Sequence, residues 1–337
     1  MKNWRTFCIR RKPHKVLLAL AVLAGVFAVL SLLLGSVNLP LGEVLGVLWG
    51  QTEGTAAQIV LYARLPRTFG CLVAGAALAA SGAMIQSVLA NPLAAPNIIG
   101  VNSGAGLMVA LSCAAAPAAA ALTPLMAFAG ALLGVCLVLF IAERTGAARI
   151  TLVLAGVAVS GMFSAGIDAV VTFVPEALNG YSDFRIGGFA NLAMERVWPA
   201  FSVTVLALAA AFTLCNEMDL LMLGTDTAQS LGLPARKYRL ILLAIAAALA
   251  GAAVSIAGLL GFVGLIVPHM VRRLVGEESR LLLAGCALGG AALLTACDLL
   301  ARLLFAPYVL PVGIVLSLAG GPFFIWLLLQ QRGGRVK

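Results

Sequence analysis

Long runs of apolar residues, separated by short polar segments, dominate the chain from end to end. A helix needs about 20 predominantly apolar residues to cross the hydrocarbon core of a membrane. We therefore predict an all-α integral membrane protein, a single domain over residues 1–337, with about ten transmembrane helices. The predicted spans are residues 16–35, 68–88, 98–115, 124–142, 151–173, 197–215, 239–257, 259–275, 281–300 and 310–329.

The longest polar interruption of this pattern is residues 216–239, between the sixth and seventh predicted spans. Within it, residues 219–223 predict one short helix. Thr225 suits the N-cap of a second, whose turn at 228–231 is stopped by Gly232. Two small helices held between apolar spans fit a docking surface for another protein or an ordinary loop. The pattern alone does not separate these two interpretations.

Composition supports a membrane protein over a large soluble domain. The 337 residues are 62% hydrophobic and 10% charged, with a mean hydropathy of +1.07. Soluble domains carry about 25% charged residues. The 36 glycines suit close packing of helices in lipid, because small residues let two backbones approach each other.

The net charge of +9 could indicate a nucleic-acid partner, but the positions of the charges relative to the predicted spans give another explanation. Of the 22 lysines and arginines, seventeen fall on the side that holds both termini. Because positive residues concentrate in cytoplasmic loops, we predict that both termini are cytoplasmic. Topology then accounts for the basic balance, and we predict no nucleic-acid partner.

A polar stripe runs along the fifth predicted span. Ser160, Ser164, Asp168 and Thr172 recur at every fourth position, so they share one face of a helix. An ionisable group within a span suggests a pathway or a buried partner. We interpret the stripe as the lining of a water-filled pathway. The alternative is that the hydroxyls bond back to the preceding turn and Asp168 lies near the outer interface.

Of the five arginines predicted on the outer side, three lie near the ends of the second and ninth spans. Arg64 and Arg67 lie just before the second span and could each grip a carboxylate, or could simply anchor the chain at the membrane interface. Asp298 and Arg302 are four residues apart, so they can pair on one helix face. Arg302 joins the first two arginines at the same side.

A turn without any charge follows the second span. Asn91-Pro92 and Ala95-Pro96 break the helix twice within a few residues. An apolar turn with Asn91 and Leu93 at its tip could close a pore, or it could be a tight connection between two helices.

Residue types that carry chemistry are not grouped in this sequence. The seven cysteines are scattered, and no pair has the spacing of a metal or redox site. His269 has no second ligand at metal-binding spacing. The phosphate-binding pattern G-x-x-x-x-G-K-[ST] is absent. We therefore predict that this chain is not itself an enzyme and that it holds no metal or cofactor. A membrane-embedded enzyme is a remote alternative.

Five segments together resemble one known family. RLPR, SGAMIQSVLANPLAAPNIIGVNSGAG, LGTDTAQSLGLP, GFVGLIVPHMVRRLVG and LPVGIVLSLAGGPFFIWLL occur in the order seen in FecCD-type permeases. These are the membrane subunits of type II ATP-binding cassette (ABC) importers for iron–siderophore complexes, haem and cobalamin. The resemblance covers roughly residues 60 to 330.

The resemblance implies a homodimer with its pathway at the dimer interface, in the bacterial cytoplasmic membrane. Two ATPase subunits, which bind the ATP and Mg²⁺, would dock on the segment between spans six and seven, and a substrate-binding protein would dock outside. An ion-coupled secondary transporter that uses Asp168 remains the competing hypothesis.

The resemblance to FecCD-type permeases also implies three sites. ATPase coupling would involve Asp219, Leu223, Gly224, Asp226, Ala228, Leu231 and Gly232. A cytoplasmic gate would involve Asn91, Pro92, Leu93, Arg149 and Ile150, and the binding protein would dock at Arg64, Arg67 and Arg302.

Overall fold

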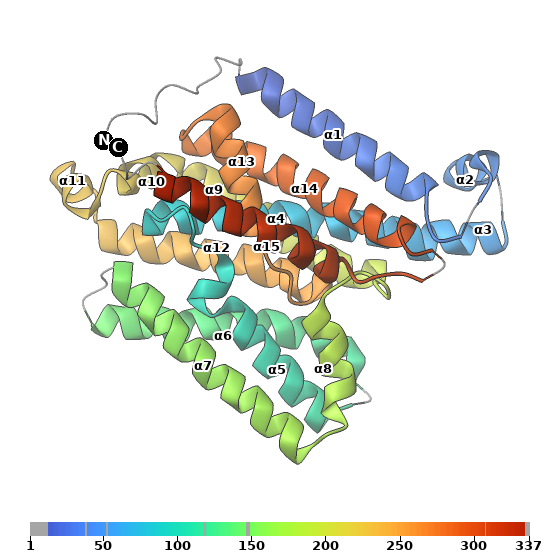
Figure 1. The fold of residues 1–337 in the computed structure, drawn as a ribbon, viewed down its shortest axis with the longest axis horizontal. Helices are drawn as coiled ribbons and strands as arrows, with labels where there is room; N and C mark the ends of the chain where they lie inside the picture. Colours follow the sequence, from blue (N-terminus) through green and yellow to red (C-terminus); the bar gives the residue numbers. More distant parts are fainter. Residues whose placement is uncertain are drawn as a thin grey trace.

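The structure is a computed structural model that describes residues 13–37, 39–51, 53–117, 119–145, 149–306 and 308–333. These residues form helices and no strand, which confirms the predicted all-α class (Figure 1). The elements are α1 Pro13–Leu33, α2 Leu41–Leu48, α3 Thr55–Gln58, η2 Ile59–Arg64, α4 Leu65–Leu89, η3 Pro96–Ile99, α5 Val101–Ala115, η4 Ala120–Leu122, α6 Thr123–Arg144, α7 Arg149–Phe173, α8 Ala177–Ile186, α9 Met194–Thr213, α10 Cys215–Met222, α11 Thr225–Ser230, α12 Ala235–Ala257, α13 Val263–Val275, α14 Ser279–Leu303 and α15 Val312–Gly333.

Each of the ten predicted spans contains a helix, but the helices differ in length. Among the described residues, seven helices are long and apolar enough to cross a membrane, and two further apolar helices are shorter. The 13 residues of α13 reach only about 20 Å, less than the ~30 Å hydrocarbon core. The number of complete spans therefore stays a prediction.

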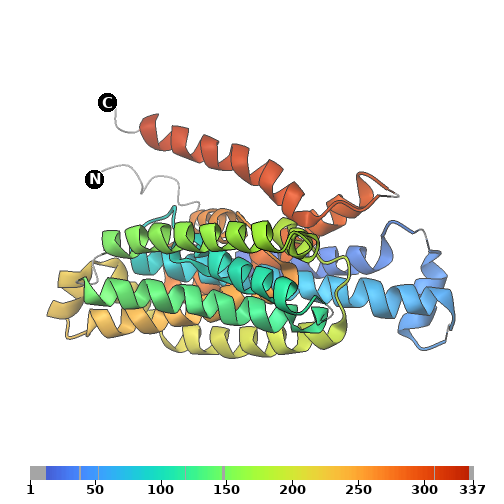
Figure 2. The same cartoon turned by 90° about the horizontal axis from the view of Figure 1, so that it is seen from below.

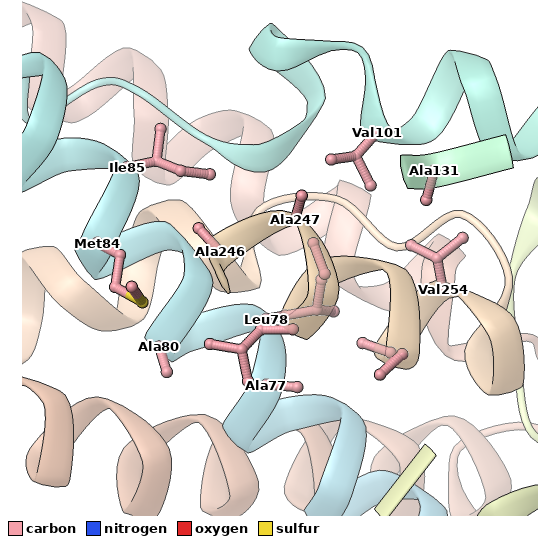
Figure 3. Close-up of a cluster of buried hydrophobic side chains, with 14 of the residues drawn as sticks. Ala77, Leu78, Ala80, Met84, Ile85, Val101, Ala131, Ala246, Ala247 and Val254 are labelled. Atoms are coloured by element: carbon pink, nitrogen blue, oxygen red, sulfur yellow. The ribbon is translucent and has the colours of Figure 1, made fainter. Parts of the chain in front are cut away.

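Helix α4 is the centre of the fold. It packs against α14, α12, α13, α9 and α1, and 83% of its most apolar stretch is buried within the chain. Small residues on α4 and α12 let these two helices interdigitate closely. Figure 3 shows this contact with Ala77, Leu78, Ala80, Met84 and Ile85 of α4, Ala246, Ala247 and Val254 of α12, Val101 of α5 and Ala131 of α6.

Two helix groups meet along α12. Helices α5 to α8 lie together on one side of it, while α4, α9, α13 and α14 lie on the other (Figure 1). Helix α1 is peripheral: it contacts α14 and α4, and only 17% of its apolar stretch is buried. Helix α15 also packs weakly, because it leaves the body of the molecule toward its carboxyl end (Figure 2).

Helices α4 and α14 touch backbone to backbone at Gly75 and Gly290. A Cβ atom added to either glycine would overlap the carbonyl oxygen of the other. We expect Gly75→Val to destabilise the protein by about 1–3 kcal/mol, because two helix backbones cannot separate without disturbing the core. Thermal unfolding in detergent would measure this. The control Gly25→Val, on the open face of α1 with nothing within 4 Å, should leave the unfolding temperature unchanged. Equal effects of both variants would contradict the prediction.

The segment 216–239 differs in detail from its sequence-based prediction. Helix α10 begins at Cys215, four residues before the predicted start, because its first turn continues from the end of α9. The prediction that Thr225 caps α11 is wrong: Gly224 is the N-cap, with φ 113°, and Thr225 is the first helical residue. A positive φ of this kind favours glycine.

Candidate functional site

A buried carboxylate holds two of the predicted outer arginines. Asp298 is fully buried, and its oxygens accept hydrogen bonds from Arg67 Nε at 3.1 and 3.0 Å and from Arg67 Nη2 at 2.8 Å. Arg302 Nε lies 3.1 Å from Asp298 Oδ2, which confirms the predicted pairing at a spacing of four. The charge cluster Arg67–Asp298–Arg302 thus joins α4 to α14.

Arg64, the third arginine of this region, binds the carboxyl-terminal end of α1. Arg64 Nη1 donates to the carbonyl oxygens of Leu32 and Leu33 at 2.8 and 2.7 Å, and Nη2 donates to that of Val37 at 2.6 Å. Helix ends leave such carbonyls unpaired, so Arg64 acts as a carboxyl-terminal cap.

Arg302 reaches α1 as well. Its Nη2 donates to Ser31 Oγ at 2.6 Å, and Ser31 Oγ also bonds Thr68 Oγ1 at 2.7 Å. The charge cluster and the α1 cap are therefore one connected network across α1, α4 and α14.

The three arginines that were predicted to dock a binding protein are buried in this network. Arg64, Arg67 and Arg302 are only 4%, 9% and 3% exposed, and each donates hydrogen bonds within the chain. Docking of a binding protein on these three side chains stays a prediction. Reversal of these charges is a poor test of it, because the substitution would also break the internal bonds.

The polar stripe lies on one face of α7, as the spacing predicts. Ser164, Asp168 and Thr172 are exposed, while Ser160 is half-buried and accepts a hydrogen bond from Ser103 Oγ at 3.1 Å. Thr172 Oγ1 donates to the carbonyl oxygen of Asp168 at 2.7 Å, the backbone bond that the alternative interpretation proposed for the hydroxyls. Whether the stripe lines a pathway stays a prediction.

The charge of Asp168 influences one titratable group on α8. Burial raises the pKa of the Tyr181 phenol, Arg185 opposes this rise, and the Asp168 carboxylate adds to it. Asp168 is thus close enough to α8 for its charge to affect Tyr181.

The predicted gate residues fall into two places. Ala90, with φ 46°, ends α4, and Asn91 Oδ1 then accepts a hydrogen bond from the Leu93 amide at 3.0 Å, which stabilises the turn. Pro92 is exposed. Ile150 is exposed at the start of α7, and the side chain of Arg149 lies outside the described residues. Gating by these residues stays a prediction.

Helix α7 rests directly on the segment that follows the turn. A Cβ atom added to Gly156 of α7 would overlap the carbonyl oxygen of Ile98 in η3. The backbones of η3 and α7 are therefore in close contact at this point.

The predicted coupling segment is fixed on its inner side and open at its tip. Arg239 is buried and its Nη2 donates to Thr225 Oγ1 at 2.8 Å, while Ala228 is fully buried. Leu223 and Leu231, at the two ends of α11, are 62% and 60% exposed. Figure 1 shows α11 at the extreme end of the molecule. Two exposed leucines beside fixed backbone suit an interface with another protein.

Asp219 of this segment reaches α14. Its Oδ1 accepts a hydrogen bond from the Ser279 amide, the first residue of α14, at 3.0 Å. The first amide groups of a helix lack partners within the helix, so Asp219 supplies one from α10. This contact links the coupling segment to the helix whose other end carries Asp298.

We expect Asp219→Ala to cost about 1 kcal/mol, the typical value for loss of a side-chain cap. Asp219→Asn keeps an oxygen acceptor and should cost less. Thermal unfolding of the two purified variants in detergent would compare them. If Asp219→Ala unfolds at the temperature of the unchanged protein, the contact contributes nothing to stability.

A cavity of about 310 Å³ lies beside the charge cluster. No local motif indicated it, because its walls come from distant parts of the chain. Its polar lining includes Arg67, Asp183, Asn191, Arg196 and Ser255. Among the described residues, no group of three or more His, Cys, Asp or Glu side chains could hold a metal ion.

Comparison with known proteins places these features in a family. The sequence profile of the FecCD transport family matches residues 22–330. The hemin transport system permease protein HmuU of Yersinia pestis is 36% identical over 335 residues, 97% of this chain and 98% of the relative. The vitamin B12 import system permease protein BtuC of Citrobacter koseri is 35% identical, over 98% of this chain and 100% of the relative.

A solved structure agrees with the sequence comparison. A structure described as an inward-facing conformation of a metal-chelate type ABC transporter superposes with a TM-score of 0.83 at 28% identity. The match covers 94% of this chain and 99% of the solved one. The architecture is therefore that of a type II ABC importer permease, and this multi-pass membrane protein belongs to the FecCD transport family.

Proposed function

We propose that this chain is the membrane-spanning permease subunit of an ATP-driven importer in the bacterial cytoplasmic membrane, with both termini in the cytoplasm. Two copies would form the pathway between them. Two separate ATPase subunits would bind ATP and Mg²⁺ and dock on the coupling segment, and an extracytoplasmic binding protein would deliver the substrate. The membership of the chain in a family of ABC permeases supports each of these roles.

The exposed face of α7 is the observation that carries the transport role. The exposed Asp168 carboxylate, with the exposed Ser164 one turn before it, would be costly against lipid, because polar groups in hydrocarbon need water or a protein partner. Helices α7 and α15 lie on the same side of the molecule, the side nearest the viewer in Figure 1 (Figures 1 and 2). A second copy placed against this side would enclose a water-filled pathway lined by the stripe.

A separate energy source is needed, because the sequence has no phosphate-binding loop of its own. The tip of α11, with Leu223 and Leu231 exposed, offers the surface on which an ATPase would act. Its motion would reach the membrane helices through the bonds of Asp219 to α14 and of Arg239 to α11.

The cargo is proposed from the relatives. Their names describe import of hemin, of iron(III) dicitrate by FecD of Escherichia coli, and of vitamin B12. In all three substrates a metal ion is bound by an organic chelating ligand. We infer that this permease moves a chelate of the iron–siderophore, haem or cobalamin type, with the choice made largely by the binding protein.

Affinity purification from native membranes tests this proposal. We expect an ABC-type ATPase to copurify at equal stoichiometry. A dimeric chain that reproducibly lacks an ATPase would instead favour the ion-coupled transporter. In that case Asp168→Asn should abolish uptake, with Ser164→Ala as a control on the same face.

A further inference from the structure

We propose that the small lobe formed by residues 41–51 and 53–64 is an anchor that inserts into the outer leaflet of the membrane. The lobe contains α2, α3 and η2 and lies at the end of the molecule opposite α11 (Figure 1). The proposal takes only the orientation of the chain from the proposed function, and does not depend on the substrate or on the ATPase.

The lobe has a core of its own, separate from the main core. Val44, Val47 and Val60 are buried together, and Leu33 and Leu39 pack against them. The lobe is thus attached to the end of α1 and is held in a defined orientation next to it.

Helix α2 is apolar on two faces, and only one of them is covered. Val44 and Val47 face the small core, whereas Leu41, Leu45 and Trp49 are exposed. Positions i, i+4 and i+8 share one side of a helix, so these three side chains form a single apolar strip. Trp49 is 78% exposed, which is unusual for so large an apolar side chain.

The strip continues a surface that must face lipid. Val22, Val26 and Val29 of α1 are exposed along a helix that is long and apolar enough to span the membrane. Leu34 and Val37, which are also exposed, connect that surface to Leu41 at the start of α2. Exposed apolar side chains are therefore present on α1, at the end of α1 and on the lobe.

Position and residue type agree with the headgroup level of the membrane. Helix α1 ends at Leu33, and α2 begins within eight residues and still contacts α1. Tryptophan and tyrosine concentrate at this level, because their rings are partly apolar and partly polar. Tyr62 of η2, 77% exposed, is a second aromatic side chain in the same lobe.

Charge argues against an acidic protein as the occupant of the strip. Residues 38–63 contain no lysine or arginine, and Arg64 at the end of the lobe is buried by its bonds to α1. The exposed Glu43 lies off the strip, on another side of α2. An apolar strip with no cation fits acyl chains and headgroups better than a carboxylate-rich surface.

Fluorescence quenching of Trp49 tests the anchor in the full-length protein. Replacing Trp4, Trp198 and Trp326 with phenylalanine leaves Trp49 as the single tryptophan. The protein would be reconstituted in phosphatidylcholine vesicles brominated near the top of the acyl chains. We expect strong quenching by these lipids and weak quenching by acrylamide, a neutral quencher in the aqueous phase.

A matched variant supplies the aqueous reference. It carries Trp49→Phe together with Leu231→Trp, which moves the only tryptophan to the exposed tip of α11. This reference should show the opposite pattern. If Trp49 is quenched by acrylamide as strongly as the reference, the lobe faces water and the proposal is wrong. Protection of Trp49 from both quenchers would mean that a protein covers the strip, which also overturns it.

Discussion

Asp298→Ala is expected to destabilise the protein by about 3–5 kcal/mol, the range found when one partner of a buried ion pair is removed. Arg67 and Arg302 would keep their charges in the interior of the protein and lose the carboxylate that both contact. Because the same network holds the end of α1 through Ser31, we expect α1 and α14 to loosen together.

Cys71 offers a direct readout of this loosening. It is fully buried and lies one turn after Arg67 on α4, next to the residue that bonds Asp298. In a variant with Cys71 as its only cysteine, maleimide labelling in detergent should be slow in the parent and fast after Asp298→Ala. Thermal unfolding would give the accompanying loss of stability.

Two further variants sharpen the test. Glu176→Ala removes an exposed carboxylate from the loop after α7 and should change stability by no more than about 0.5 kcal/mol. Adding Arg67→Met to Asp298→Ala removes one of the uncompensated charges and should recover part of the loss. Unfolding of Asp298→Ala at the parent temperature would show that the network contributes little.

Leu231→Asp is expected to weaken coupled transport strongly while leaving the membrane fold intact. Leu231 is exposed at the end of α11, where no core contact would be lost. A charge placed in an apolar interface costs about 2 kcal/mol or more, so docking of the ATPase should weaken by about 30-fold. Substrate uptake into vesicles, measured together with ATP hydrolysis, would separate docking from folding.

The conservative change Leu231→Met is the matched control, because it keeps the apolar contact. It should support uptake near the parent rate.

The neighbouring Gly232, at φ 85°, allows a second test. Gly232→Val strains the backbone that ends α11 and should also uncouple hydrolysis from uptake. Normal coupled transport in Leu231→Asp would remove the docking role from α11.

Helix positions were predictable because the membrane imposes a strong local rule. A backbone in hydrocarbon must satisfy its own hydrogen bonds, so each long apolar run becomes a helix. The four-residue spacings of the α7 stripe and of Asp298 with Arg302 follow from helix geometry alone, and the structure confirms both. The prediction that Thr225 is the N-cap of α11 was wrong. Gly224 and Thr225 are both suitable N-cap residues, and the local sequence does not decide between them.

The outer arginines show the limit of local reasoning. Arg67 and Asp298 are 231 residues apart, and no spacing rule links such positions. A basic residue beside a span can face water, lipid headgroups or a buried carboxylate with the same neighbours in sequence. Packing of α4 against α14, made possible by Gly75 and Gly290, brings the charges together.

By itself, the sequence determined the membrane class, the positions of the helices in the ten predicted spans, the shared face of the α7 stripe and the family, because each of these can be recognised from runs of neighbouring residues. Only the tertiary structure decided which faces meet. It turned Arg64 into a cap for α1, joined Asp219 to α14, and left α7, α15 and α2 with apolar or polar surfaces uncovered. The physical reason is that burial and ion pairing depend on the distance between side chains in space, which the order of residues along the chain does not specify.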